Sequence, residues 1–161
     1  MFLGLSGLSA TYDEKFLDYD VDGPNAIADL GAVNDTVYGA DGELARALSV
    51  RPQGFPLHIY RARHVGTVAC VLATVDYGPS HQRRCGVYFV ATIPSARNRG
   101  LATRLLTAAL RDARRRGCIV STLQATQSGE PVYAALGYRT DFKFRVFIRE
   151  TTVATCPRGE A

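Results

Sequence analysis

The sequence predicts an α/β domain in which helices flank a mixed, mostly antiparallel sheet. An apolar run with strand composition, Gly86 to Ile93, leads through a short basic turn into an amphipathic helix that begins at Leu101. Two earlier strand-like runs, Leu57 to Tyr60 and Gly66 to Val75, are close enough in sequence to form a hairpin, to which the run from Gly86 returns antiparallel. A last run, Phe142 to Glu150, alternates apolar and charged residues with the period of a strand.

The N-terminal residues 1–24 carry the weakest pattern. The opening MFLGLSGLSA is apolar but short, and no basic residue precedes it, so we do not interpret it as a signal peptide. The polar stretch that follows favours a loop, with a short strand at Phe16 to Tyr19. We therefore expect a poorly defined segment over residues 1–24, one domain over residues 25–150 and a C-terminal tail over residues 151–161.

Two helices are expected before the hairpin. Residues Asn25 to Val37 repeat apolar side chains at helical spacing, and Gly42 to Leu48 forms a second, shorter helix. In the hairpin, which turns about Arg61 to His64, His58 and Tyr60 alternate with apolar neighbours. We therefore expect one face of this part of the sheet to be polar and to border a groove or solvent.

The helix that begins at Leu101 is the clearest local pattern. Arginines crowd its last turn, where cations interact favourably with the helix dipole, and Gly117 is placed to end it. After it we expect a strand from Cys118 to Gln124 and a short helix from Gly129 to Leu136. The apolar stripe of the long helix comprises Leu101, Leu105, Leu106, Ala109, Leu110 and Ala113.

The turn that precedes this helix has the properties of an anion-binding site. The first N–H groups of a helix have no intrahelical partner, so they attract an anion. Gly100 lets the backbone approach a ligand closely, and Ala102 adds little bulk. Arg97 and Arg99 supply donors suited to phosphate. A Walker loop or a dinucleotide fingerprint would need glycines in a pattern that this turn lacks.

Composition narrows the classes of partner. The chain carries 19 Lys and Arg against 15 Asp and Glu, a net charge of +4. The arginines are spread along the chain and concentrate only around the turn and the helix after it, so a small polyanionic cofactor explains the charge better than nucleic acid does. No apolar run reaches membrane-spanning length, so we expect no membrane partner and a cytoplasmic location.

The cysteines and histidines show no ligand pattern. Cys70, Cys85, Cys118 and Cys156 are far apart and form no C-x-x-C pair, and the three histidines have no metal-ligand spacing with them. Small buried thiols are common in strand-like runs. We therefore interpret the cysteines as reduced and structural, and we expect no metal site.

Two motifs resemble the signatures of the GNAT superfamily of acyl-CoA N-acyltransferases. Arg97-x-x-Gly100-x-Ala102, after a strand that ends in a bulge-like Val90-Ala91-Thr92, resembles the pyrophosphate-binding motif [Q/R]-x-x-G-x-[G/A]. Downstream, Pro131 to Tyr138 resembles the second signature, x-x-Y-x-x-x-G-[F/Y], with Tyr133 as its tyrosine. The resemblance covers about Leu57 to Arg149, with the two motifs at the spacing of the family.

The resemblance implies a GNAT-like fold, a cosubstrate and a site. Members of the family open with a strand and two helices, and we expect the usual first strand to be missing here. The pantetheine arm of acetyl-CoA, the cosubstrate, inserts as a pseudo-strand beside the bulged strand, and the basic turn receives the pyrophosphate. The implied cofactor-binding residues are Phe89, Val90, Ala91, Thr92, Arg97, Asn98, Arg99, Gly100, Leu101, Ala102, Thr103, Thr126 and Tyr133.

The resemblance also implies the chemistry, which is direct attack of an acceptor amine on the thioester carbonyl. The main-chain N–H of Val90 holds the oxyanion, and Tyr133 is the general acid. A phenol has a pKa close to that of a thiol, so proton transfer from Tyr133 to the leaving thiolate would be nearly isoergic. Two features depart from the family. Thr126 stands where many members carry an asparagine that contacts pantetheine, and the bulged strand lacks the glutamate that often serves as base.

Four side chains are alternatives for the missing base. His58 and His81 have a suitable ordinary pKa, and Asp41 or Glu43 would act from the helical wall of the cleft. Tyr38 and Asp41 are expected to line the acceptor side. An acceptor whose amine has a low pKa, or solvent that takes the proton, would make a dedicated base unnecessary.

We therefore predict an N-acetyltransferase (EC 2.3.1.-) that transfers an acetyl group from acetyl-CoA to a primary amine of a small molecule or peptide. The alternative is a non-catalytic acyl-CoA-binding domain with a regulatory or interaction role. A DNA-binding protein is a third and weaker interpretation of the basic surface. Dimers are common among relatives, which leaves a homodimer open.

Overall fold

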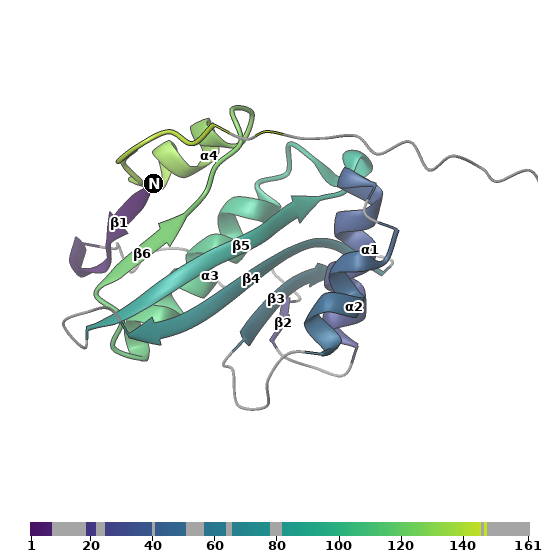
Figure 1. Ribbon diagram of the computed structural model, residues 1–161, viewed down its shortest axis with the longest axis horizontal. Coiled ribbons are helices and arrows are strands. Elements are labelled where there is room, and N and C mark those ends of the chain that lie inside the picture. Colours follow the sequence, from purple (N-terminus) through teal and green to yellow (C-terminus); the bar gives the residue numbers. More distant parts are fainter. Residues whose placement is uncertain are drawn as a thin grey trace, which may run out of the picture.

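The computed structural model describes residues 1–7, 19–21, 25–39, 41–50, 57–63, 66–77, 82–145 and 147. Within them a single sheet lies between helices (Figure 1). In chain order the elements are β1 (Phe2–Gly4), a 3-10 helix (Leu5–Gly7), β2 (Tyr19–Val21), α1 (Ala26–Tyr38), α2 (Glu43–Ser49), β3 (Leu57–Arg63), β4 (Thr67–Tyr77), β5 (Arg83–Thr92), a second 3-10 helix (Pro94–Ala96), α3 (Leu101–Arg115), β6 (Val120–Leu123) and α4 (Glu130–Ala135).

The sheet has six strands in the order β1-β6-β5-β4-β3-β2. All neighbouring strands are antiparallel except β5 and β6, which are parallel. A parallel pair needs a crossover connection, and α3 supplies it. The prediction of a mixed, mostly antiparallel sheet flanked by helices is confirmed.

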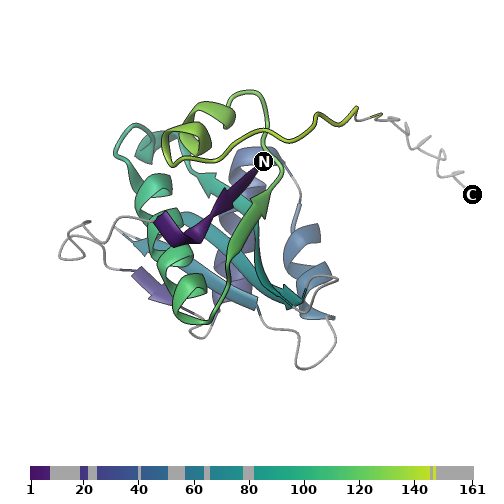
Figure 2. The same ribbon diagram turned by 90° about the vertical axis from the view of Figure 1, so that its left-hand side faces the viewer.

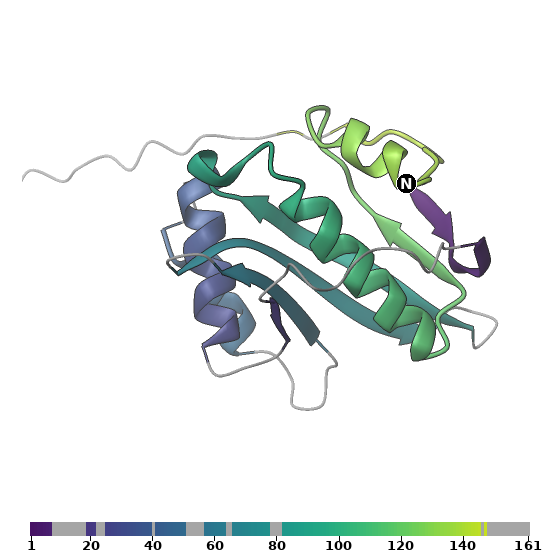
Figure 3. The same ribbon diagram turned by 180° about the vertical axis from the view of Figure 1, so that it is seen from behind.

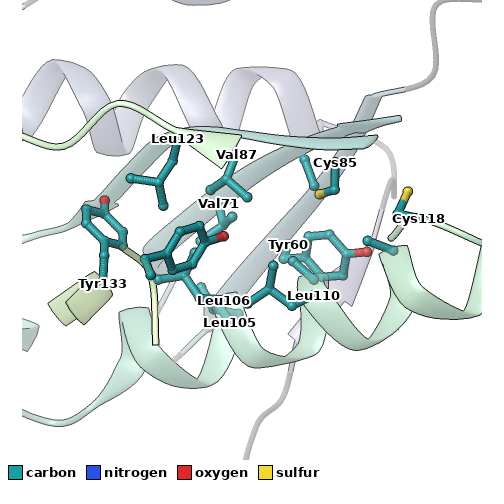
Figure 4. Packing of buried hydrophobic residues seen from close by; sticks show 14 of the residues in the cluster. Tyr60, Val71, Cys85, Val87, Leu105, Leu106, Leu110, Cys118, Leu123 and Tyr133 are labelled. Atoms are coloured by element: carbon teal, nitrogen blue, oxygen red, sulfur yellow. The ribbon is translucent and has the colours of Figure 1, made fainter. Parts of the chain in front are cut away.

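Helix α3 crosses one face of the sheet, as Figure 3 shows from behind. Its predicted apolar stripe is the buried side of the helix, and Leu105, Leu106 and Leu110 are fully buried. This packing fixes the start of α3 beside the end of β5. The buried side chains between α3 and the sheet include Tyr60, Val71, Cys85, Val87, Leu105, Leu106, Leu110, Cys118, Leu123 and Tyr133, all labelled in Figure 4.

Helices α1 and α2 lie on the opposite face of the sheet, as the edge-on view in Figure 2 shows. Their apolar side chains pack mainly over β3 and β4, where Leu30 meets Ile59 and Leu72 in a second, smaller core. An ion pair ties α1 to the sheet, because the fully buried Arg61 of β3 donates to the half-buried Asp29 carboxylate. Helix α1 therefore has a fixed position relative to the strands.

Residues that showed little pattern in the sequence complete both edges of the sheet. Strand β2 pairs with β3, so the first strand that was expected to be missing is present. It overlaps the weak pattern at Phe16 to Tyr19 only at Tyr19, and residues 16–18 lie outside the described part of the chain. Strand β1 pairs with β6 at the other edge (Figure 2), and Leu5 after it is buried. Three-residue strands are too short to show a period.

The predicted last strand, Phe142 to Glu150, is wrong over the residues that the structure describes. Residues 142–145 and 147 form no strand, and the rings of Phe142, Phe144 and Phe147 are exposed. The remainder of the predicted strand and the tail over residues 151–161 lie outside the described residues.

A single bridge to the sheet explains this difference. The main-chain N–H groups of Phe2 and Arg139 each donate to the other residue's carbonyl at 2.9 Å. The two segments are antiparallel there, so the chain after Arg139 runs past the first residue of β1. Beyond that point β1 offers no further residues to pair with an alternating sequence, because a strand forms only beside a partner.

The polar face predicted around His58 and Tyr60 is also wrong. Tyr60 is buried beneath α3, and its hydroxyl donates to Asp112 at 2.7 Å. Burial and this carboxylate raise the pKa of Tyr60. Because side chains alternate along a strand, His58 belongs to the same face. A tyrosine with one polar atom can face a core as well as water, and the alternation alone does not distinguish the two.

Candidate active site

Strands β5 and β6 pair over only part of their length. Their register runs from Arg84 opposite Val120 to Val87 opposite Leu123 and then stops. Beyond this point the strands diverge, as Figure 1 shows, while β5 continues as far as Thr92. Among the described residues no strand pairs with this second half of β5 on the side away from β4. Such an edge offers main-chain N–H and C=O groups to an extended ligand.

A bulge lies at the start of the half of β5 that lacks a partner on the β6 side. The register with β4 shifts so that two residues of β5, Phe89 and Val90, face one residue of β4. Phe89 has a φ of 51°, which residues other than glycine seldom adopt. The bulge was expected over Val90 to Thr92, but Ala91 and Thr92 pair regularly with β4. It therefore lies one residue earlier than the sequence indicated.

A buried hydroxyl at the end of the open edge lacks a partner. Thr92 Oγ1 is buried and makes no hydrogen bond to any residue in the described part of the chain. The Thr92 carbonyl accepts from Arg97 Nε at 3.2 Å, so Arg97 is anchored to the end of β5. Buried polar atoms are nearly always satisfied in proteins, so the orphaned hydroxyl suits a site that a polar ligand completes.

The turn after β5 exposes an uncapped helix start. Gly100 is the N-cap of α3, and no side chain caps the first N–H groups there. Its φ of 70° favours glycine, and a Cβ at this position would meet nothing within 4 Å. The space above the turn is therefore open. The predicted cradle, Arg97 to Thr103, is exposed over its first four residues and half-buried over the next three.

Tyr133 on α4 brings a phenol to the open edge. Its ring is 8% exposed and packs edge-on against Tyr138, with the ring centroids 6.1 Å apart. The Tyr138 hydroxyl lies 2.7 Å from that of the buried Ser121, which fixes this neighbour. The Tyr133 hydroxyl makes no hydrogen bond that the described residues account for. It is therefore available to a ligand.

The environment of Tyr133 changes its acidity. Burial first, and the nearby Tyr38 hydroxyl second, raise the pKa of Tyr133 to about 12. The phenol therefore stays protonated at neutral pH. The expectation of nearly isoergic proton transfer does not hold for a thiol of ordinary pKa, because the difference of roughly 3 pKa units corresponds to about 4 to 5 kcal/mol. Transfer becomes easier only if the site raises the pKa of the thiol as well.

Tyr38 at the end of α1 reaches the same place from the other side. Its hydroxyl donates to the Val90 carbonyl at 3.5 Å, a long hydrogen bond, and its ring is largely exposed. Val90 also packs against the buried cluster that contains Tyr133. The structure thus brings Tyr38, Val90 and Tyr133 together, from α1, β5 and α4, and the expectation that Tyr38 borders the cleft agrees with these contacts.

Thr126 has a local role in the structure. The Gly129 N–H donates to Thr126 Oγ1 at 3.2 Å, at the start of α4. A Cβ on Gly129 would lie 3.1 Å from the Tyr133 ring, so this glycine gives the ring its room. Both residues therefore position Tyr133. Sequence reasoning missed Gly129, although a glycine four residues before the tyrosine was a usable signal.

The expected bases are scattered. His58 shares the α3 face with the buried Tyr60, on the opposite side of the sheet from α1. His81 lies outside the described residues. Asp41 and Glu43 are both exposed, at the turn into α2 and in its first residue. Of the described candidates, the structure therefore places His58 on the face of the sheet away from α1, and Asp41 and Glu43 at the start of α2.

Asp76 is occupied elsewhere. Its carboxylate accepts from Arg84 Nε at 3.0 Å, and the two residues face each other across β4 and β5. Arg84 precedes Val90 by six residues along β5, which corresponds to roughly 20 Å. Asp76 is therefore too far from the bulge to act there.

The described cysteines lie away from the open edge. Cys85 and Cys118 are free and buried, and Cys85 faces Ser121 in the closed half of β5. Burial raises the pKa of Cys85 to about 12, which keeps the thiol protonated. Cys156 and the Cys70 side chain are outside the description. Among the described residues no three His, Cys, Asp or Glu lie together as metal ligands, and no helix is long and apolar enough to span a membrane.

The fold and the open edge define a class of protein, an α/β domain in which the free edge of one strand leads to an uncapped helix start. The family model described as "Acetyltransferase (GNAT) family" matches residues 32–138, more than half of the chain. The chain therefore belongs to the GNAT acetyltransferase family, as an N-acetyltransferase (EC 2.3.1.-) of a family that uses acetyl-CoA. No curated protein matches the chain.

Solved structures share the fold. A predicted acetyltransferase from Clostridium acetobutylicum, solved with acetyl-CoA, has a TM-score of 0.68 and 20% identity and covers 81% of this chain and 96% of its own. An acetyltransferase from Trypanosoma brucei has a TM-score of 0.68, 18% identity and coverage of 82% and 99%. AAC(6')-Iy, in complex with the bisubstrate analog CoA-S-monomethyl-acetylneamine, has a TM-score of 0.64, 18% identity and coverage of 84% and 99%. At these identities the likeness shows the fold alone.

Proposed function

We propose that the chain transfers the acetyl group of acetyl-CoA to a primary amine by direct attack at the open edge of β5. The observation that carries this proposal is the half of β5 that pairs with β4 alone, Tyr88 to Thr92, which leads directly to the uncapped start of α3. A ligand with an extended amide-containing arm and a pyrophosphate fits a strand edge followed by a helix N-terminus. Acetyl-CoA has this composition, and a protein of the same fold was solved with it.

The proposed binding residues divide into two groups. The main chain of the bulge and the end of β5, Phe89 to Thr92, offers hydrogen bonds to the pantetheine arm, and Thr92 Oγ1 gains the partner it lacks. The turn and the first residues of α3, Arg97 to Thr103, offer N–H groups and guanidinium donors to the pyrophosphate. Thr126 contributes indirectly, because it holds the start of the helix that carries Tyr133.

The proposed chemistry uses two groups of this chain. Acetyl-CoA supplies the thioester carbonyl that the amine attacks. The Val90 N–H is our proposed donor to the carbonyl oxygen as that oxygen gains negative charge. Tyr133 donates its proton to the sulfur as the bond between carbon and sulfur breaks, and its raised pKa ensures that the proton is present at pH 7. Tyr38 holds the Val90 carbonyl and so orients the bulge.

Calorimetric titration with acetyl-CoA tests the proposal. We expect saturable binding by the unaltered protein and a loss of at least about 100-fold in affinity for Gly100→Glu, since a carboxylate there repels the phosphates. Arg99→Ala should weaken binding less, because the N–H groups remain. Gly66→Glu is the matched control, because Gly66 also has a positive φ and open space around it but lies between β3 and β4. Absence of binding, or equal losses in both glutamate variants, would contradict the proposal.

A further inference from the structure

The bulge presents two neighbouring aromatic rings on one side of the sheet. Consecutive side chains of a regular strand point to opposite faces. Tyr88 and Phe89 break this rule, because their ring centroids lie only 6.5 Å apart and each residue is 43% exposed. The left-handed φ of Phe89 produces this arrangement, at a conformational cost of about 1 to 3 kcal/mol. Strain of this kind is typical of functional sites, which points to a functional role for the two neighbouring rings.

The ring of Tyr88 lies over Gly86, which leaves space for it on the surface of the sheet. A Cβ at Gly86 would lie 2.6 Å from Cε2 and 2.9 Å from the hydroxyl oxygen of Tyr88. A Cβ at this position would therefore force the Tyr88 ring to move, whereas glycine leaves it room to lie back along β5. The Tyr88 hydroxyl makes no hydrogen bond that the described residues account for. The ring is therefore an aromatic surface that begins two residues from Val90.

Two carboxylates on the α1 side of the sheet are engaged with cations or hydroxyls of the protein itself. Asp76 is paired with Arg84, and Asp29 accepts from Arg61 and from the Thr67 hydroxyl. An acceptor with several ammonium groups needs free carboxylates beside the aromatic surface, and these two do not supply them. The surface instead matches an acceptor that carries one flat, apolar group.

The position of the possible bases limits the acceptor further. An alkylammonium, with an ordinary pKa near 10, must lose a proton before it attacks. His58 lies on the other face of the sheet and Asp76 is roughly 20 Å from Val90 along β5. Asp41 and Glu43 are exposed to solvent. An amine whose nitrogen is attached directly to an aromatic ring is already neutral at pH 7 and needs none of these groups.

We propose that the acceptor is an amine attached directly to an aromatic ring, and that this ring stacks on Tyr88 and Phe89. The proposal rests on the function proposed above. The nitrogen lone pair attacks the thioester carbon, and a bond between carbon and nitrogen forms. The bond between carbon and sulfur breaks, and its electron pair goes to sulfur. Sulfur takes a proton from Tyr133, and the nitrogen loses one to solvent, from which Tyr133 is reprotonated. The products are an N-aryl acetamide and free CoA.

A panel of four amines tests the class, with free-thiol release from acetyl-CoA as the readout. The panel is 4-methylaniline (aromatic and weakly basic), phenethylamine (aromatic and strongly basic), trifluoroethylamine (weakly basic without a ring) and cyclohexylamine (neither). We expect kcat/KM for 4-methylaniline to exceed each of the others by about tenfold or more. An equal or higher kcat/KM for any other amine, or no acetylation of 4-methylaniline, overturns this inference.

Variants of Tyr88 and Gly86 test whether the acceptor ring binds at Tyr88. Tyr88→Ala should raise KM for 4-methylaniline about tenfold, with a much smaller change in kcat, while Tyr88→Phe keeps the ring and should keep KM. Gly86→Ala should raise KM as well, because its Cβ displaces the ring. An unchanged KM in Tyr88→Ala overturns the proposal, and if that variant does not fold the amine panel still decides.

Titration of acetyl-CoA on the same preparation separates the two proposals. If acetyl-CoA binds and the amine panel shows another order, only the acceptor class is wrong. If acetyl-CoA does not bind, the proposed function fails and this inference fails with it.

Discussion

The two halves of β5 belong to one strand but are held in different ways. The half that precedes Tyr88 pairs with β4 on one side and with β6 on the other, and Cys85 and Val87 are buried in it. The half from Tyr88 to Thr92 pairs with β4 alone, and it contains a bulge, two exposed rings and a buried hydroxyl without a partner. The first half contributes stability, and the second half leaves hydrogen-bonding and packing capacity unused.

The difference shows how the free edge of a strand, together with the turn that follows it, can form a site. Helix α3 packs against one face of the sheet beneath β5 and β6. After Leu123 the chain turns from β6 towards α4 and leaves the end of β5 without a neighbouring strand on that side. Groups that would satisfy each other in a continuous sheet are thus available to a ligand. Mutations in the two halves should therefore have separable effects, on stability in one and on binding or catalysis in the other.

The largest expected effect comes from Tyr133, the proposed general acid beside the half of β5 from Tyr88 to Thr92. Tyr133→Phe removes the general acid, so kcat should fall by about 100-fold or more while the dissociation constant for acetyl-CoA changes little. Tyr138→Phe is the matched control, because this neighbouring hydroxyl contacts Ser121 and should cost stability of about 1 kcal/mol without a comparable loss of kcat. Steady-state kinetics with calorimetry measure both. Similar kcat values for Tyr133→Phe and the unaltered enzyme would rule out Tyr133 as the acid.

One substitution in each half tests the separation directly. Val87→Ala leaves a cavity beneath β5, so the free energy of unfolding should fall by about 2 kcal/mol while acetyl-CoA affinity is kept. Thr92→Val removes a buried hydroxyl without a partner, so the free energy of unfolding should stay level or rise slightly, and acetyl-CoA affinity should fall about tenfold. Urea titrations and calorimetry measure the two quantities. Loss of both in either variant would mean that the halves are not independent.

The pH dependence of stability should report on Cys85, which lies in the half of β5 that pairs with both β4 and β6. The pKa of Cys85 rises from 9.0 to about 12 on burial, so its contribution is fully present below pH 9 and is lost between pH 9 and pH 12. At pH 10 the unfolded chain has released this proton and the folded chain has not. The free energy of unfolding should therefore fall by about 1.4 kcal/mol from this group between pH 8 and pH 10. Cys85→Ala should reduce the decline by that amount, and an unchanged decline would argue against a protonated, buried thiol.

The smallest expected effect concerns the contact across the cleft. Tyr38→Phe removes a long, exposed hydrogen bond to the Val90 carbonyl, so stability should change by less than about 0.5 kcal/mol. The bulge loses one restraint, and kcat should fall only about twofold to fivefold. A fall as large as that of Tyr133→Phe would give Tyr38 the role of acid, and the comparison between the two variants settles which hydroxyl matters.

The sequence predicted those parts of the fold whose pattern is local. The run from Gly86 through Gly100 into α3 was recognisable because a strand, a glycine turn and an amphipathic stripe each have a short-range signature. Tyr133 was predicted as a site residue because it lies at a fixed place in a motif. The start of α3 at Leu101 agrees with the prediction to the residue.

Features that depend on distant partners were not predictable. Strands β1 and β2 have three residues each, and only their neighbours in the sheet make them strands. The segment from Phe142 has the better strand pattern, but its described residues, 142–145 and 147, pair with no strand. The residue at which β5 and β6 stop pairing is likewise set by how β6 continues to α4, and the sequence of β5 contains no signal for it. Gly86 was missed because its meaning comes from the ring of Tyr88, which lies over it.

The pairing of β1 with β6 has a consequence during synthesis. The amino group of Met1 donates to the Leu123 carbonyl at 2.9 Å across 122 residues of chain. At roughly 5 to 20 residues per second, a ribosome takes on the order of ten seconds to make the strand that β1 must meet. For that interval Leu5 and its apolar neighbours have no place to dock, and they are exposed to chaperones and to other nascent chains. Strand β1 is thus complete on the ribosome long before the strand with which it pairs.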